Sequence, residues 1–455
     1  MTVDTASRHS TMSGPARFDP AAEAERATQA ILADFTSAHY RGVVVDSPPG
    51  AGKSTLVVRA AAEIAATGEP LMIVAQTNEQ VDDLVDRLAR RLAQNMPSAR
   101  IGRLSRAGYT APDRIANLPN VTVDSDLTAL GEPTITIATA AKWAHVKDRT
   151  WRWAIVDEAY QMRSDSLLAI ASRFERALFV GDPGQLDPFS TVDSDRWRGL
   201  TWDPMQSAVA VLLRNNPDLP VHRLPVSWRL PHTAERIIAD AFYPHTGFRS
   251  GTGPGERGLR LGTASGGSTA PIDAVLNEAA ASGWGLLELP ARYTVRTDSE
   301  AAAAVAAVAR RLIERRAVAR SADQEQPITP QRIAIGAAHR DQVAAIRTAL
   351  GNLPVAVDTA NRLQGREYDV TVVLHPLSGR RDASAFHLES GRLCVLASRH
   401  RQACVVVARA GIREVLDTHP PTGPVHLSEP VKFPDGWVAN QTVMAHLEAH
   451  RVRVR

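Results

Sequence analysis

Short apolar runs alternate with stretches of helical spacing along the first half of the chain. The apolar runs predict buried strands over residues 43–45, 71–75, 134–138, 154–156 and 177–180. Residues 21–39 and 54–67 repeat apolar side chains at the spacing of a helix, and Gly68 is a typical helix terminator. Near-continuous apolar strands separated by helices are typical of a parallel sheet covered on both faces. We therefore expect a doubly wound α/β domain.

The second half repeats this alternation and predicts a second α/β unit. Its strands are expected at residues 285–289, 333–336, 355–357, 370–374 and 404–408. An Ala-rich helix is expected over residues 300–316. Two segments interrupt the pattern: residues 94–132 predict an insertion or loop-rich subdomain, and the Gly/Ser/Thr-rich residues 250–271 predict a flexible surface loop.

Composition narrows the class of protein. The 455 residues hold 44% hydrophobic and 22% charged side chains, as in a soluble globular protein of two to four domains. The sequence lacks an apolar window long enough for a membrane helix, so no membrane segment is expected. The N-terminal residues lack the apolar core of a secretory signal, so no such signal is expected either. Cys394 and Cys404 lie in apolar stretches without metal-ligand spacing, which favours a cytoplasmic protein. The net charge of +3 only weakly indicates an anionic partner.

A glycine-rich turn follows the first predicted strand and opens a helix. It consists of Pro48, Pro49, Gly50, Ala51, Gly52, Lys53, Ser54 and Thr55. Backbone N–H groups of such a turn bind phosphate together with the helix dipole, and its lysine reaches the β- and γ-phosphates. The hydroxyl of Ser54 suits Mg²⁺. The pattern usually starts with Gly where this chain has Ser47, and the alternative is an ordinary Pro/Gly turn that caps a helix.

Acidic and amide side chains follow later strands of the same predicted sheet. Asp157 and Glu158 end the fourth strand, and Gln185 follows the fifth. Phosphoryl transfer to water needs one carboxylate for Mg²⁺ and one group for the attacking water, and Asp157 and Glu158 can divide these roles. Gln185 is placed to sense the γ-phosphate. The alternatives are a solvated acidic pair and an inert loop glutamine.

Further short motifs follow one another along most of the chain. In order they are Gln76-Thr77-Asn78, Thr139, Asp157 to Gln161, Gly181 to Leu186, Val226 to Leu230 with Ala241-Phe242-Tyr243, Ala338 to Gln342, Asp358-Thr359 with Leu363 to Asp369, and Arg392 to Arg399. This ordered set resembles the superfamily 1 class B helicases with a DEAxQ box, the group of the nonsense-mediated-decay and Okazaki-fragment-processing helicases. The resemblance covers about residues 29–408.

The resemblance implies two tandem RecA-like domains, with ATP and Mg²⁺ in the cleft between them and single-stranded DNA or RNA across their top. The residues it implies in hydrolysis are Lys53, Asp157, Glu158, Gln185, Arg229 and Arg399. Mg²⁺ would be held by Ser54 and Asp157. Nucleotide contacts are implied for Gln29, Gly50, Ala51, Gly52, Lys53, Ser54, Thr55, Trp228, Gly365 and Glu367. Among them, Gln29 corresponds to the residue that reads adenine, Trp228 to the one that stacks on the base and Glu367 to the one that contacts the ribose.

Contacts to the single strand are implied for Thr77, Asn78, Thr139, Thr359 and Gln364. Such contacts go mostly to phosphate and sugar, so binding is expected to be largely independent of sequence. The last motif, Arg392 to Arg399, departs from the family at Cys394 and Ser398, where Asn and Thr are usual. The stretch between Asn78 and Thr139 is short, so reduced accessory subdomains are expected.

These expectations divide the chain into four parts. Residues 1–20 are expected to be a disordered tail, 21–222 the first RecA-like domain, 223–425 the second, and 426–455 a C-terminal tail. The leading function is an ATP-driven helicase or translocase that moves 5′→3′ on a single strand; DNA is the working substrate, although the sequence does not separate DNA from RNA. The alternative is an ATP-gated switch subunit that depends on an accessory protein. A nucleotide kinase would not need the later motifs.

Overall fold

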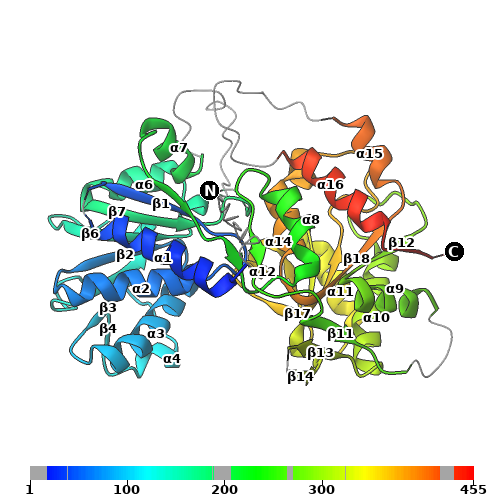
Figure 1. The fold of residues 1–455 in the computed structure, drawn as a ribbon, viewed down its shortest axis with the longest axis horizontal. Helices are drawn as coiled ribbons and strands as arrows, with labels where there is room; N and C mark the ends of the chain where they lie inside the picture. Colours follow the sequence, from blue (N-terminus) through cyan, green and yellow to red (C-terminus); the bar gives the residue numbers. More distant parts are fainter. Residues whose placement is uncertain are drawn as a thin grey trace, which may run out of the picture.

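The computed structural model describes residues 18–37, 39–186, 188, 206–263, 270–322, 324–420 and 435–454. Two α/β units lie side by side, each built on its own parallel sheet (Figure 1). The expected N-terminal tail falls almost entirely outside the described residues, and helix α1 begins at Pro20. The expectation of an α/β fold with two tandem RecA-like domains is confirmed.

The first unit contains an eight-stranded sheet in the order β4-β3-β5-β2-β6-β7-β1-β8, and all its paired neighbours run parallel. The strands are β1 (Gly42–Asp46), β2 (Leu71–Ala75), β3 (Ile101–Leu104), β4 (Val121–Asp124), β5 (Ile135–Thr139), β6 (Trp151–Asp157), β7 (Phe174–Gly181) and β8 (Val221–Arg223). The five predicted strands are confirmed as β1, β2, β5, β6 and β7.

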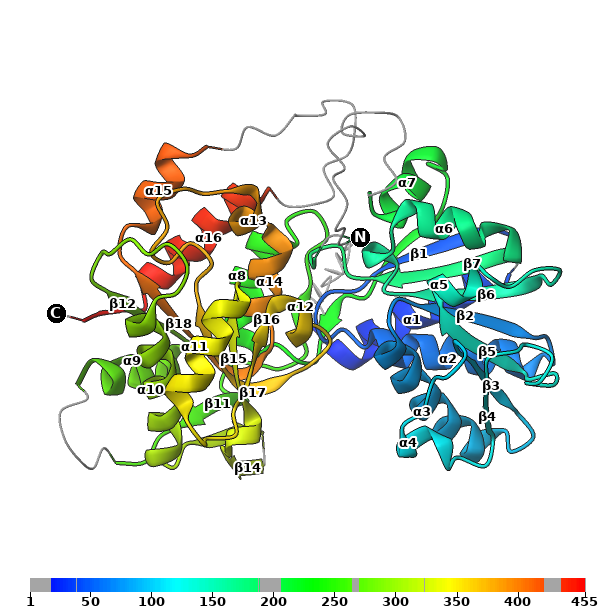
Figure 2. The same cartoon turned by 180° about the vertical axis from the view of Figure 1, so that it is seen from behind.

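Helices cover both faces of this sheet (Figures 1 and 2). On one face lie α1 (Pro20–Thr36), α2 (Lys53–Ala66), α3 (Asn78–Asn95) and α4 (Asp113–Ala116). On the other lie α5 (Ala140–Trp143), α6 (Ser164–Ile170), α7 (Ala208–Asn215) and the short 3₁₀ turns η1 (Ala159–Gln161) and η2 (Ala171–Arg173). Val43 and Val45 of β1 pack into the first core and Val44 into the second, as the two-residue period of a strand requires.

The second unit contains a six-stranded parallel sheet in the order β16-β15-β17-β18-β12-β19. Its strands are β12 (Trp284–Leu289), β15 (Ile333–Ala337), β16 (Ala356–Thr359), β17 (Tyr368–Leu374), β18 (His400–Arg409) and β19 (Arg451–Arg453). The five strands expected here are confirmed. The sixth, β19, comes from the expected C-terminal tail and pairs with β12.

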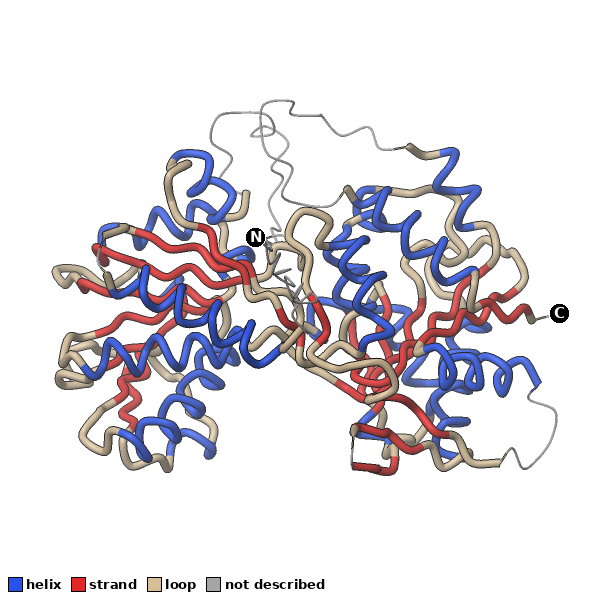
Figure 3. The backbone as a smooth tube through the Cα atoms, viewed as in Figure 1, coloured by secondary structure: helices blue, strands red, loops and turns tan. Residues whose placement is uncertain are grey.

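Helices again lie on both faces of the sheet (Figure 3). One face is covered by α9 (Ala270–Ser282), α10 (Ser299–Glu314) and α11 (Arg340–Leu350), with the turn η4 (Pro330–Arg332) before β15. The other is covered by α8 (His232–Phe242), α12 (Ala360–Leu363), α14 (Ser390–Ala397), α15 (Ile412–Thr418) and α16 (Gly436–Glu448), next to α13 (Ala385–Leu388). Helix α16 thus packs on the second core, and its residues are part of this unit instead of a free tail.

Two segments expected to be irregular form strands. Residues 94–132 contain β3, α4 and β4, which extend the first sheet. Within residues 250–271, Arg257–Arg260 forms β11, which pairs antiparallel with β13 (Val318–Ser321). That loop assignment is wrong at β11, because the pairing partner lies far away in sequence and local composition does not report it.

Few other strands occur in the described part of the chain. The hairpin strand β14 (Gln324–Pro327) completes a three-stranded sheet with β11 and β13. The short strands β9 (Val226–Ser227) and β10 (Arg249–Ser250) pair with each other. Among the described residues, no helix is long and apolar enough to cross a membrane.

Candidate functional site

The loop between β1 and α2 lines a cavity. Gly50 and Gly52 have left-handed backbone angles, with φ of 73° and 90°, and Gly52 caps α2 without any side-chain hydrogen bond. The first N–H groups of the helix therefore remain available, and the helix dipole favours an anion there. Ser47 is buried, donates its N–H to the carbonyl of Gly181 (2.8 Å) and lacks a left-handed φ. Serine in place of glycine therefore costs no backbone strain.

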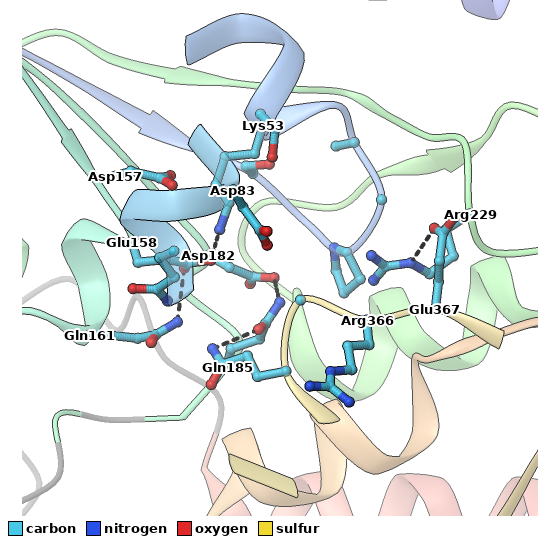
Figure 4. Close-up of a pocket in the computed structure, with 18 of the residues that line it drawn as sticks. Lys53, Asp83, Asp157, Glu158, Gln161, Asp182, Gln185, Arg229, Arg366 and Glu367 are labelled. Atoms are coloured by element: carbon cyan, nitrogen blue, oxygen red, sulfur yellow. Dashed lines mark hydrogen bonds and ion pairs between the residues drawn. The ribbon is translucent and has the colours of Figure 1, made fainter. Parts of the chain in front are cut away.

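Lys53 and Glu158 form an ion pair in this cavity (Figure 4). Burial alone would lower the pKa of Lys53, but the carboxylates of Glu158 and Asp157 outweigh it and raise that pKa, so the lysine stays charged. Glu158 also accepts a hydrogen bond from Gln161 Nε2 (2.8 Å) and has a left-handed φ of 53°. A non-glycine residue held at such angles costs on the order of 1–3 kcal/mol and is typical of functional sites.

Asp157 lies buried at the end of β6, and its Oδ1 has no hydrogen-bond partner among the described residues. Burial raises the pKa of its carboxyl to about 6, against the attraction of Lys53. This oxygen lies beside the glycine-rich turn of residues 48–55, which we call the phosphate loop. An unpaired buried carboxylate oxygen there fits Mg²⁺, which takes one or two protein ligands together with phosphates and water. No group of three or more His, Cys, Asp or Glu side chains suited to a metal occurs in the described ranges. Asp157 and Ser54 would therefore hold the ion only with a nucleotide.

The loop after β7 reaches toward the second unit. Asp182 is buried, which raises the pKa of its carboxyl to about 6, and it accepts a hydrogen bond from Gln185 Nε2. The other end of Gln185 accepts from Gln364 Nε2 of the second unit at 2.9 Å. The two glutamines thus connect the units across the cavity.

Arg229 and Arg399 line the cavity, and both come from the part of the chain after β8, the last strand of the first sheet. Nε of Arg229 lies 3.1 Å from Oε2 of Glu367, which also pairs with Arg401 (2.7 Å). Arg399 is buried, and its guanidinium donates to the carbonyl of Val395 (3.1 Å) and to Ser398 Oγ (2.9 Å). Burial, assisted by Arg229, lowers the pKa of Arg399 to about 10. Ser398, a departure from the family pattern, thus orients the arginine.

One cavity of about 920 Å³ collects most of the expected site residues. It is lined by Gly50, Ala51, Gly52, Lys53, Ser54, Thr55, Thr77, Asp157, Glu158, Gln185, Arg229, Gln364, Gly365, Glu367 and Arg399. Its walls come from both α/β units, so it is a cleft between them.

Five expected residues do not line the cavity: Gln29, Asn78, Thr139, Trp228 and Thr359. Gln29 is exposed on α1 and donates to Glu25 (2.7 Å). Trp228 is partly exposed, and its ring packs at Gly251. Its backbone N–H donates to the carbonyl of Gly50 (2.9 Å). In this structure neither side chain is positioned to contact a nucleotide in the cleft.

The remaining three residues lie at strand or helix ends. Thr139 caps α5 by accepting from the N–H of Lys142 (3.2 Å), and Asn78 accepts from Nη2 of Arg103 (2.9 Å). Thr359 ends β16. Thr77 lines the cleft and also caps α3. The hydrogen-bonding side chains at these ends are thus used largely for capping and packing.

Other cavity residues were not predicted as site residues. Gln161 and Asp182 belong to motifs used for the family resemblance, so their positions were a usable signal. Arg366 follows Gly365 and forms an ion pair with Glu79 on α3 (3.3 Å), which bridges the units. Nothing local in the sequence indicates that pairing, because it depends on how the two units face each other.

Comparisons with family models match a part of each α/β unit. Two family models, each described as an AAA domain, match residues 25–196 and 290–411. The first match includes the phosphate loop and the acidic pair Asp157 and Glu158 at the end of β6. The search of curated proteins found no match.

Three solved structures match most of this chain at low sequence identity. The PRRSV helicase is 15% identical, with a TM-score of 0.43 over 89% of this chain and 60% of its own. The Arterivirus nonstructural protein 10 (helicase) is 16% identical, with a TM-score of 0.43 over 85% and 61%. A complex of the Arterivirus protein with DNA is 15% identical, with a TM-score of 0.43 over 87% and 65%. This chain spans between 60% and 65% of the length of these proteins.

Proposed function

We propose that this protein is an ATP-hydrolysing motor on single-stranded nucleic acid, a superfamily 1 helicase of class B that moves 5′→3′. One observation carries the proposal. Lys53, Asp157 and Glu158 from the first unit line the same cleft as Arg229 and Arg399. A nucleotide bound to the phosphate loop would thus meet the carboxylates of one wall and the arginines of the other, and its hydrolysis would need both.

The ion pair between Lys53 and Glu158 is the resting state of this cycle. A γ-phosphate bound in the loop competes with Glu158 for Lys53, which releases the glutamate to orient or deprotonate water. Gln161 already holds the other carboxylate oxygen. When bound, Mg²⁺ would neutralise charge on the β- and γ-phosphates, and Ser54 and Asp157 would hold it.

The arginines supply the charge that the transition state requires. An arginine aimed at the transferring phosphoryl group is worth roughly 10³–10⁵ in rate. Arg229 is paired with Glu367 here, so closure on ATP would exchange that carboxylate for phosphate. Because Arg399 extends from the second sheet, its approach couples hydrolysis to movement of the two units.

The proposed single strand crosses the top of both units. Thr77, Asn78, Thr139, Thr359 and Gln364 would contact phosphate and sugar, which favours binding independent of sequence. Gln364 already reaches Gln185 through a 2.9 Å hydrogen bond, so a strand held by Gln364 would act directly on the γ-phosphate sensor. On this proposal Gln29 and Trp228 would turn toward the adenine only after ATP has bound.

A second candidate is an ATP-gated switch that needs an accessory protein. It is favoured by the small extent of structure outside the two parallel sheets in the described residues. A switch would bind a strand in response to ATP with little movement along it. A strand-displacement assay with a 5′ single-stranded overhang, run beside the ATPase assay, separates the two functions.

The variant Glu158→Gln tests the coupling between ATP and strand. The amide removes the base while preserving the side-chain shape, so ATP should bind without being hydrolysed and hold the cleft closed. We expect about 5- to 150-fold tighter binding of a fluorescent single strand with ATP than without it, as a coupling free energy of about 1–3 kcal/mol predicts. Equal affinities in the two states would contradict the proposal. Glu63→Gln, on the outer part of α2, is the control.

A further inference from the structure

Tyr243 joins the two walls of the nucleotide cleft. It caps the C-terminus of α8 in the second unit, and its Oη donates to Oδ1 of Asp182, in the first unit, at 2.7 Å. Both residues are buried. The tyrosine ring packs at Gly184, where a Cβ would lie only 2.6 Å from the ring carbon Cζ. Asp182 and Gly184 belong to the loop that leads to Gln185. The ring and the hydroxyl of Tyr243 together hold this loop in place.

The same hydroxyl also contacts the helix that leads to Arg399. Oη of Tyr243 lies 3.5 Å from Sγ of Cys394 on α14. Val395, the next residue, accepts a hydrogen bond from Nε of Arg399 (3.1 Å). Cys394 stands where the family usually has Asn, and in this structure its thiol contacts the hydroxyl of Tyr243. One hydroxyl therefore touches both the loop of the phosphate sensor and the helix that positions an arginine.

We propose that Tyr243 is a positioning residue that keeps the Asp182–Gln185 loop and α14 together, so that the sensor and Arg399 engage the same nucleotide. The inference depends on the proposed function, because it concerns ATP turnover in that cleft. The tyrosine does not touch the reacting atoms. Its effect passes through Asp182, which holds Gln185, and through α14, which holds Arg399.

Electrostatics give this arrangement a measurable signature. The hydrogen bond from Tyr243 opposes the rise that burial causes in the pKa of Asp182, which stands at about 6. The pKa of Tyr243 is raised well above 10 by burial, so the hydroxyl remains a donor. The side chains that face Asp182 are Lys53, Glu158, Tyr160, Gln185, Tyr243, Cys394 and Arg399, and the backbone N–H of Gly184 donates to its Oδ1 at 3.0 Å. Removing the hydroxyl takes away a bond to the charged carboxylate, so the pKa of Asp182 must rise further.

The test compares Tyr243→Phe with Tyr109→Phe. Both changes remove one hydroxyl that donates to an aspartate, but the partner of Tyr109 is Asp82, whose side chain does not line the cleft. In Tyr243→Phe we expect the kcat of strand-stimulated ATP hydrolysis to fall about tenfold, the scale of one hydrogen bond to a charged group. KM for ATP should change less than kcat, because the phosphate loop is intact. The acid limb of the pH–rate profile should move to higher pH.

The outcomes separate this inference from the proposed function. Wild-type protein without any strand-stimulated hydrolysis would contradict the proposed function itself. A stimulated wild type with an unchanged kcat and pH profile in Tyr243→Phe would overturn the role of Tyr243 alone. A rise in KM without a fall in kcat would indicate ordinary packing and would also overturn it. A fall in kcat equal to that in Tyr109→Phe would do the same. If Tyr243→Phe does not fold, Asp182→Asn replaces it, and the proposal then requires the same fall in kcat with the acid limb abolished.

Discussion

Gly50 shows how tightly single residues constrain the cleft. Its φ is 73°, and a Cβ on it would lie 2.2 Å from Cβ of Arg229. The backbone of Trp228 donates to the same glycine's carbonyl. The phosphate loop and the segment that carries Arg229 therefore touch directly, and only a residue without a side chain allows it.

Gly50→Ala should abolish most ATP turnover, and Gly68→Ala should not. Both glycines have left-handed φ, of 73° and 79°, so both alanines incur a backbone cost of about 1 kcal/mol. Only Gly50 has a neighbour in the way, since a Cβ at Gly68 meets nothing within 4 Å. We expect at least a tenfold loss of kcat/KM for Gly50→Ala and a loss of less than twofold for Gly68→Ala. Similar kinetics in the two variants would show that the contact with Arg229 is unimportant.

At the residue scale, the sequence predicted which side chains gather in one cleft better than it predicted how they pair. Lys53, Glu158 and Arg399 were placed in one site from their motifs, and all three line the cleft. Their current partners were not predictable: the pairing of Lys53 with Glu158 depends on a sheet that brings β1 beside β7 and β7 beside β6. The positions of Gln29 and Trp228 outside the cleft likewise depend on tertiary packing.

Among the elements, two of the strands that were missed, β3 and β19, contain arginines that are paired in the folded protein. β3 contains Arg103, which is fully buried because Asp82 on α3 holds it at 3.1 Å. A charged residue interrupts the apolar run by which a buried strand is recognised in a sequence. β19 reads Arg-Val-Arg, and both arginines pair with Glu288 on the neighbouring β12. The continuous apolar strands needed no such partner and were predicted correctly.

Helix α16 carries a pH dependence of stability. His446 on this helix and His400 on β18 both pack edge-to-face on Trp284. Burial lowers the pKa of His446 to about 4 and that of His400 to about 3. Protonation therefore favours the unfolded chain, where histidine titrates near 6.5. The stability contributed by these neutral rings is complete above about pH 6.5 and is lost as the pH falls toward 4 and then 3.

The variant His446→Phe should weaken this pH dependence. Phenylalanine keeps an aromatic ring beside Trp284 and cannot be protonated. We expect the free energy of unfolding in urea to fall less steeply between pH 7 and pH 5 than in the wild type. Some slope should remain, because His400 and His375 are also buried with lowered pKa values. His145→Phe, at an exposed position, is the control; an identical slope in wild type and His446→Phe would contradict the assignment.

For the whole molecule, the decisive feature is that one cleft is shared by two sheets. The described contacts between its walls include the ion pair of Arg366 with Glu79 (3.3 Å) and the hydrogen bond of Gln364 with Gln185 (2.9 Å). These two contacts are individually weak, which suits the proposed cycle in which the walls would separate and close. The buried hydrogen bond from Tyr243 to Asp182 (2.7 Å) is a stronger link between the same walls. The sequence predicted two domains and their order but not these contacts, because they depend on the orientation of one domain against the other.

The central claim is that nucleic acid controls hydrolysis in this cleft, and steady-state ATPase activity tests it most directly. The purified chain would be measured alone and with poly-dT, poly-U or duplex DNA at two salt concentrations, with Lys53→Ala as the inactive control. We expect strong stimulation by a single strand that weakens with salt, because binding to phosphates releases counterions. Hydrolysis that no nucleic acid changes, or hydrolysis that persists in Lys53→Ala, would contradict the account.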